Sequence, residues 1–268
     1  MSLASDRGSW NLSARFPSTM RRRDFLSLAA ANAALSSCAE GAGPSPRKKN
    51  HARAIAVVKR ILPKLREDLA KKGLAPGEPV HLRFFKESSE MELWMRPPTS
   101  EEWKLFKEWK IARWSGKLGP KKEMGDGQTP EGFYYTNRDS LNPESRFHLS
   151  FDINYPNARD RALNLTGNLI MVHGSVYSIG CYAMTDPVIE EIYTLVSMAI
   201  AQGQTEVPIH CFPFRMKPSR MTKAEKSAEE AAHLAFWQQL EPAWRLFEET
   251  KRLPQITNDK GDYIVKPA

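Results

Sequence analysis

The spacing of apolar residues changes twice along the chain, and this change limits the folds open to it. Between Pro79 and Met216 the apolar residues form short runs that turn-forming residues separate. Runs of this length predict β-strands. Before and after this segment, apolar residues recur three or four positions apart, as they do on one face of an α-helix. We therefore predict a fold that is mainly β with flanking α-helices.

The flanking segments have helical periodicity. Residues 51–78 form a predicted N-terminal helix with five apolar residues at helical spacing, namely Ile55, Val58, Leu62, Leu65 and Leu69. Gly73 is the predicted stop of this helix, and Pro63 is expected to kink it. Residues 217–268 form a predicted C-terminal helical extension, with one helix from Thr222 to Lys251 that is rich in good helix formers.

Seven segments of the central region are predicted to hold strands: residues 80–85, 91–95, 101–114, 133–135, 147–153, 169–172 and 207–212. The segment 101–114 is ambiguous, because its aromatic residues also have helical spacing. Its aromatic and β-branched content favours strands. Asp186-Pro187 predicts the start of one helix in this region, which runs to about Ala201.

The first 38 residues have the pattern of an export signal. Arg21, Arg22 and Arg23 precede an apolar stretch over residues 28–35, and small residues lead to Cys38. A membrane-spanning helix needs about 20 apolar residues, so we expect this stretch to be cleaved. The arginines resemble a twin-arginine signal, and residues 35–38 resemble a lipobox with a lipidated cysteine. The sequence thus predicts an exported, periplasmic lipoprotein anchored to the membrane through Cys38.

Two alternatives for the N-terminus stay open. A plain secretory signal cleaved elsewhere, or a chance arginine cluster on a buried helix, fits the same residues. Residues 1–19 match neither a signal nor a fold, so Met20 rather than Met1 is the expected start of translation. Residues 39–50 have linker composition and would tether the domain to the membrane surface.

Charge and composition exclude several classes of function. The formal net charge is +8, and removal of residues 1–37, with five arginines against two aspartates, leaves 8 − 3 = +5. No recognised nucleic-acid module accompanies this mild basicity, so no nucleic-acid partner is expected. The six histidines have no metal-ligand spacing, and the glycines over 125–132 do not match a phosphate-binding loop. We predict neither a metal nor another cofactor.

An imidazole and a thiol lie close together between a predicted strand and a predicted helix. His173 precedes Cys181 by eight positions. A thiol is mostly protonated near neutral pH, so a nucleophilic cysteine needs a neighbouring base. His173 is the predicted proton acceptor and donor, and backbone N–H groups around Gly180 are predicted to hold an oxyanion. The alternative is a buried structural cysteine beside a loop histidine.

Four further residues are weaker candidates for this site. Gly174 and Ser178 belong to the predicted loop between the histidine and the cysteine, and His148 and Ser175 are candidate substrate contacts. Each of them also suits a purely structural role. Cys211 could form a disulfide with Cys181 in an oxidising compartment. Its apolar strand neighbours favour a free, buried thiol.

The residues around the pair form a recognisable motif. His173-Gly174, followed by Ser178-Ile179-Gly180-Cys181, resembles the signature of the YkuD-type L,D-transpeptidases. Further segments resemble the YafK-like subgroup of that family: residues 115–121, 125–134, 147–151, 155–158 and 212–216. The resemblance covers residues 79–216, and it implies that this region is a catalytic domain folded as a mainly antiparallel β-sandwich.

The resemblance also implies a reaction. Cys181 would attack a stem-peptide amide of peptidoglycan at the diaminopimelate position and form a thioester acyl-enzyme. The interval between His173 and Cys181 is shorter than in the better-known transpeptidases, and Ile179 stands where many of them carry a second histidine. The YafK-like group has this short interval and is thought to include amidases that detach lipoprotein from peptidoglycan. The alternatives are such an amidase and a catalytically silent wall-binding lipoprotein.

Overall fold

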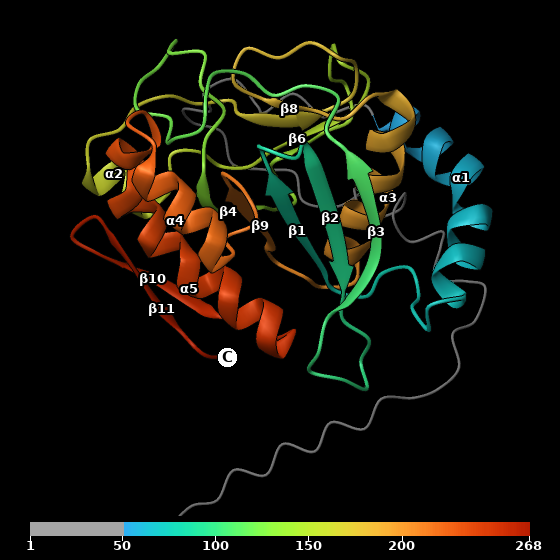
Figure 1. Ribbon diagram of the computed structural model, residues 1–268. Coiled ribbons are helices and arrows are strands. Elements are labelled where there is room, and N and C mark those ends of the chain that lie inside the picture. Colours follow the sequence, from blue (N-terminus) through green and yellow to red (C-terminus); the bar gives the residue numbers. More distant parts are fainter. Residues whose placement is uncertain (1–50) are drawn as a thin grey trace, which may run out of the picture. The chain divides into compact units, whose positions relative to one another are not determined.

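The computed structural model describes residues 51–268. The predicted export signal, Cys38 and the linker up to residue 50 lie outside the described residues. The described part of the chain contains two main sheets, five α-helices and a C-terminal hairpin (Figure 1). None of its helices is long and apolar enough to cross a membrane.

The larger sheet has five strands in the order β3-β2-β1-β9-β4. Their bounds are Val80–Phe85 for β1, Glu90–Met95 for β2, Lys104–Lys110 for β3, Gly132–Thr136 for β4 and Val207–Phe212 for β9. The predicted strand character of residues 101–114 is confirmed, with a single strand, β3. β1 pairs with β9 in parallel, and the other pairs are antiparallel.

The smaller sheet has four short strands in the order β5-β6-β7-β8. They are Leu141–Asn142, Ser150–Asp152, Met171–His173 and Tyr182–Ala183. β7 and β8 run parallel, and the other pairs are antiparallel. The predicted fold class, mainly β with flanking helices, is confirmed. Each sheet nevertheless contains one parallel pair, so the sandwich is not wholly antiparallel.

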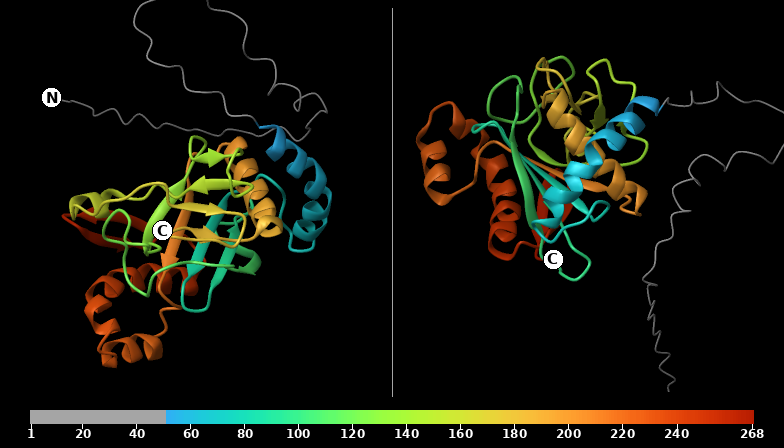
Figure 2. Two further views of the ribbon diagram at one scale, coloured as in Figure 1. Left: turned by 90° about the horizontal axis from the view of Figure 1, so that it is seen from above. Right: turned by 90° about the vertical axis from the view of Figure 1, so that its right-hand side faces the viewer.

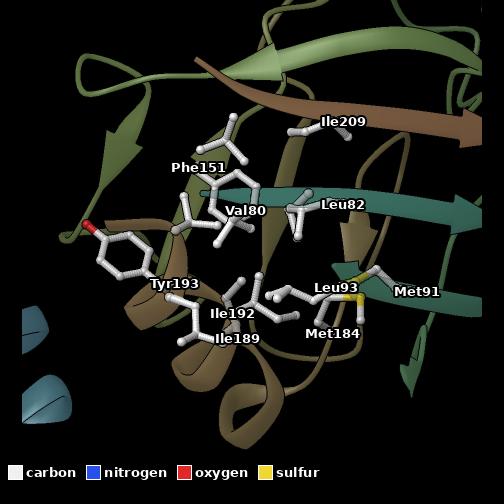
Figure 3. Close-up of a cluster of buried hydrophobic side chains, with 14 of the residues drawn as sticks. Val80, Leu82, Met91, Leu93, Phe151, Met184, Ile189, Ile192, Tyr193 and Ile209 are labelled. Carbon is white, nitrogen blue, oxygen red and sulfur yellow. The ribbon is translucent and has the colours of Figure 1, made fainter. Parts of the chain in front are cut away.

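Helix α3 (Asp186–Ala201) forms the core together with both sheets. It contacts β1 and β9 of the larger sheet and β6 and β7 of the smaller one. Figure 3 shows Ile189 and Ile192 of α3 facing Val80 and Leu82 of β1. All four of these side chains are buried. The helix predicted to begin at Asp186-Pro187 is confirmed, and it packs against both sheets.

Helix α1 (Ala52–Ala70) packs on α3, on the side of the larger sheet opposite to α4 and α5 (Figure 2). The predicted end of the helix is confirmed, because Gly73 follows it with φ of +65°. The predicted buried face was wrong in part. Ile55 is 64% exposed, and Ala54 and Val57 are buried in its place.

The C-terminal extension is helical as predicted, but the single helix predicted from Thr222 to Lys251 was wrong. It contains α4 (Pro218–Lys226), a 3-10 turn over Glu230–His233 and α5 (Leu234–Thr250). Ser227 ends α4 with extended backbone, and Arg220 turns back to pair with Glu230. The hairpin of β10 (Gln255–Asp259) and β11 (Asp262–Lys266) then follows, which the sequence analysis missed. A short helix, α2 (Ala158–Ala162), begins at a capping box on Asn157.

Helix α5 covers the second face of the larger sheet, so β1 is buried on both faces. His81 of β1 and His210 of β9 lie side by side there, with ring centroids 4.4 Å apart. Burial, reinforced by the nearby Arg83 charge, lowers the pKa of His81 to about 3. Burial also holds the pKa of His210 well below its ordinary 6.5. Both imidazoles are therefore neutral in the folded protein.

This pair predicts loss of stability in acid. Below pH 6.5 the unfolded chain binds protons at both imidazoles and the folded protein does not, so unfolding becomes easier as pH falls. Each imidazole should contribute a slope of about 1.4 kcal/mol per pH unit to the free energy of unfolding, down to its folded pKa. His81→Asn keeps a donor for the Pro208 carbonyl, which His81 Nδ1 contacts at 3.1 Å, and should reduce the slope.

Urea unfolding at a series of pH values measures this slope. The exposed His51 provides a matched control, and His51→Asn should leave the slope unchanged. An unaltered slope in His81→Asn would show that other groups cause the acid sensitivity.

Candidate active site

His173 and Cys181 lie on the same face of the smaller sheet. β7 pairs with β8 in parallel, with Val172 opposite Tyr182 and His173 opposite Ala183. Val172 and Tyr182 belong to the hydrophobic core. Because side chains alternate along a strand, His173 and the residue that precedes Tyr182 point to the other face. The strand spacing and rise place the Cα atoms of His173 and Cys181 about 8 Å apart.

The sulfur of Cys181 lies against the start of β7. The backbone N–H of Met171 donates to Sγ at 3.4 Å, and Sγ lies 3.8 Å from the carbonyl oxygen of Leu169, to which the thiol donates. Burial raises the pKa of the Cys181 thiol above its ordinary 9.0, while the Met171 N–H opposes this shift. The thiol is therefore protonated at neutral pH and needs a base.

The imidazole of His173 is arranged to act as that base. Its Nδ1 lies 2.5 Å from the carbonyl oxygen of Gly174. A carbonyl can only accept a hydrogen bond, so Nδ1 carries the proton and Nε2 carries a lone pair. Phe147 stacks on the ring at 4.7 Å. Burial lowers the pKa of His173 below 6.5, so the ring is neutral and Nε2 can take a proton from a thiol.

Two hydroxyl groups hold the backbone of the cysteine. The Ser178 hydroxyl donates to the Cys181 carbonyl at 2.7 Å, and the Thr129 hydroxyl donates to the same oxygen at 3.2 Å. Ser178 Oγ also accepts the Gly180 N–H at 3.3 Å. Gly180 has φ of +129°, a conformation that L side chains rarely adopt. The predicted loop residues Ser178 and Gly180 thus form the turn that presents Cys181.

Gly174 and Ser175 attach the other end of this loop to α3. A Cβ on Gly174 would lie 2.5 Å from Asp186 Oδ1 and 2.8 Å from the Phe147 carbonyl oxygen, so only glycine fits. The backbone N–H of Ser175 donates to Asp186 Oδ1 at 2.7 Å. Both residues therefore position the loop, and Asp186 was missed by the sequence analysis.

Two other candidates have different surroundings, and the Cβ of one of them, His148, lies close to Gly174. His148 Nε2 contacts Glu190 of α3 at 2.9 Å, and Arg53 of α1 donates to the His148 carbonyl at 2.6 Å. Helix α3 thus holds the ring of His148, and helix α1 holds its backbone. Cys181 and Cys211 are both free, and Cys211 is buried in β9. The prediction of a free, buried Cys211 is confirmed.

The sequence analysis also missed several residues of the site. Thr129 and Met171 contact Cys181 directly, and Ser115 donates its backbone N–H to Thr129 Oγ1 at 3.0 Å. Ser115 and Thr129 fall within the segments that resemble the YafK-like group, so the motif contained a signal for them. The Met171 contact is made by backbone and leaves no such signal.

The rim of the site is apolar and exposed. The side chains of Leu169, Val176, Tyr177 and Ile179 are all exposed, and Ile179 reaches 90% exposure. Three of them belong to the loop between His173 and Cys181. Cys181 itself is partly accessible, and Leu169 contacts its sulfur through the backbone carbonyl.

Comparison with known proteins agrees with the motif. The sequence profile of the L,D-transpeptidase catalytic domain, YkuD, matches residues 97–209, which include the His173–Cys181 loop. The chain is 39% identical over 189 residues to "Putative L,D-transpeptidase YafK" of Escherichia coli strain K12, across 70% of this chain and 74% of that protein. The protein of the same name from Escherichia coli O157:H7 gives the same values.

Three solved structures resemble the chain more distantly. The helical cell shape determining protein Pgp2 from Campylobacter jejuni matches with a TM-score of 0.41 and 17% identity, over 73% of this chain and 80% of that one. A mutant of Pgp2 gives 0.42 and 20% identity, over 64% of this chain and 57% of that one. Bd1075 of Bdellovibrio bacteriovorus matches with a TM-score of 0.37 and 17% identity, over 68% of this chain and 78% of that one.

The site geometry predicts a thiol that ionises only in alkali. The rate of Cys181 alkylation by iodoacetamide should rise with pH, with a midpoint above 9, because burial disfavours the thiolate. His173→Asn should leave this midpoint high, since the buried environment of the sulfur remains. Peptide mapping by mass spectrometry identifies the labelled cysteine, and the buried Cys211 serves as an internal unreactive control. A midpoint below 7 would instead show a preformed thiolate and imidazolium pair.

Proposed function

We propose that this chain, which belongs to the L,D-transpeptidase family, modifies peptidoglycan with Cys181 as nucleophile and His173 as proton acceptor and donor. One observation supports these roles above the others. The Nδ1 of His173 donates to the Gly174 carbonyl, which leaves Nε2 free as a base on the face that it shares with Cys181.

The proposed reaction begins at an amide carbonyl of a stem peptide, at the diaminopimelate position. Nε2 of His173 takes the proton of the thiol as Sγ attacks the carbonyl carbon. The backbone N–H groups of the Gly180–Cys181 turn are the proposed donors to the oxyanion. The C–N bond then breaks, and His173 returns the proton to the leaving amine. The product is a thioester between Cys181 and the stem peptide.

The second half of the reaction depends on the acceptor. An amine that attacks the thioester gives a cross-link or an attached protein, and water gives hydrolysis. We propose that water competes well in this chain. The loop between His173 and Cys181 is short, its side chains Val176, Tyr177 and Ile179 point to solvent, and the thiol is partly exposed. Amidase activity that releases a wall-attached lipoprotein would then exceed cross-linking.

Intact sacculi that carry attached lipoprotein provide the test. The wild-type protein should release the lipoprotein. It should form fewer new 3→3 cross-linked dimers than the number of lipoprotein molecules that it releases. Cys181→Ala should lower both activities by on the order of 10⁴-fold or more, and His173→Asn should leave a small residual rate. Mass spectrometry of the digested wall reports cleavage and cross-linking together.

Cys211→Ala is the matched control for this assay, because it removes the other thiol of residues 51–268 and should leave the rate unchanged. Full activity in Cys181→Ala would contradict the mechanism. An inactive wild-type protein that still binds sacculi would support the wall-binding lipoprotein instead.

The lipid anchor at Cys38 is a separate part of the proposal. Cells fed an alkyne fatty acid should attach it to the wild-type protein, because the lipobox cysteine is the acceptor in such signals. Cys38→Ser should lose the label, and Cys211→Ser should keep it. Gel fluorescence after click coupling measures the label, and equal labelling of Cys38→Ser would exclude this anchor.

A further inference from the structure

The face that carries His173 and Cys181 also carries two residues of β6. Ser150 lies opposite His173, and Asp152 lies opposite Met171. Phe151, between them, is buried in the core, so alternation directs Ser150 and Asp152 to the catalytic face. Continuation of the β7–β8 register places Met171 beside Cys181. Asp152 and Cys181 are then two strand spacings apart, about 10 Å between Cα atoms.

Asp152 and Glu78, which precedes β1, differ from most other buried or partly buried carboxylates of residues 51–268, because neither forms a salt bridge. Glu92, Glu131, Asp126 and Glu190 each pair with at least one lysine or arginine. In the same part of the chain no lysine or arginine pairs with Asp152, whose Oδ1 accepts the backbone N–H of Asn154 at 2.8 Å. Lys121 is the nearby cation that acts on the Cys181 thiol, and Asp126 already holds it at 2.5 Å.

Ser150 is a second polar group that lacks a partner. Its side chain is 1% exposed, and no hydrogen-bond partner for Oγ exists among the described residues. A buried hydroxyl without a partner costs free energy. Its position opposite His173 puts this buried hydroxyl on the same side of the smaller sheet as the imidazole.

The unpaired carboxylate acts against the nucleophile in the free protein. Asp152 contributes to the raised pKa of Cys181, after the larger effect of burial. Burial also raises the pKa of Asp152 itself. Both effects diminish when a cation binds at Asp152, because the added positive charge favours the carboxylate and the thiolate alike.

We propose that Asp152 binds a primary ammonium group of the acyl donor. The inference rests on the proposed function, since it requires the scissile carbonyl at Cys181. The separation of Asp152 from Cys181 suits the side chain of a diamino acid whose carbonyl is attacked and whose distal amine is free. The enzyme would thereby select stem peptides in which that amine is not acylated.

The test uses two stem tetrapeptides, one with a free distal amine on the diamino acid and one with that amine acetylated. Wild-type protein should prefer the free amine by about 10- to 100-fold in kcat/KM, the range expected for a charge-assisted hydrogen bond. Asp152→Asn keeps the acceptor for the Asn154 N–H and should remove this preference, mainly through a higher KM for the free amine. Glu144→Gln, an exposed acid in the preceding loop, should keep it.

Binding supplies a second readout that does not depend on turnover. In a Cys181→Ala background, calorimetry should show tighter binding of the free amine peptide, and Asp152→Asn should equalise the two peptides. A preference that survives Asp152→Asn, or an equal loss for both peptides, would overturn the role of Asp152. A wild-type protein without activity on either peptide would overturn the proposed function, and this assignment with it.

Discussion

The parallel pairing of β7 with β8 is the constraint on which the site depends. Parallel strands normally need a long crossover between them, yet only residues 174–181 join this pair. The return is possible because the two strands are three and two residues long. The short loop requires the left-handed backbone of Gly180, and hydroxyl donors fix its end at Cys181. His173 and Cys181, the proposed base and nucleophile, are thus joined by a loop of only a few residues.

Burial then determines the protonation states of the pair. The same environment lowers the pKa of His173 and raises that of Cys181, so the resting site holds a neutral imidazole and a neutral thiol. A resting ion pair is disfavoured. In the proposed reaction, proton transfer therefore accompanies attack on the substrate. Such a thiol resists adventitious oxidation better than a preformed thiolate does, since the thiolate is the reactive species. The partly exposed sulfur benefits from this protection.

The local sequence pattern predicted the strands and the helix whose own apolar residues form the core. Strands β1, β2 and β9 and helix α3 were predicted to within a residue or two, because their apolar runs face the core directly. The motif singled out His173 and Cys181, and the structure places them at the two ends of one short loop. The break at Ser227 depends on a pairing between Arg220 and Glu230, and Asp152 reaches the site only through strand register. Contacts between separate segments of the chain cannot be read from the local sequence pattern.

Helix α3 links the catalytic loop to the core. Its apolar face lies among side chains of both sheets, and its first residue, Asp186, accepts the N–H of Ser175. The lack of space at Gly174 shows how closely the loop approaches Asp186. A core substitution that shifted α3 would therefore also move the loop that positions His173 relative to Cys181. Because close-packed cores transmit strain, the geometry of this site is set as much by the packing of Ile189 and Ile192 as by the loop itself.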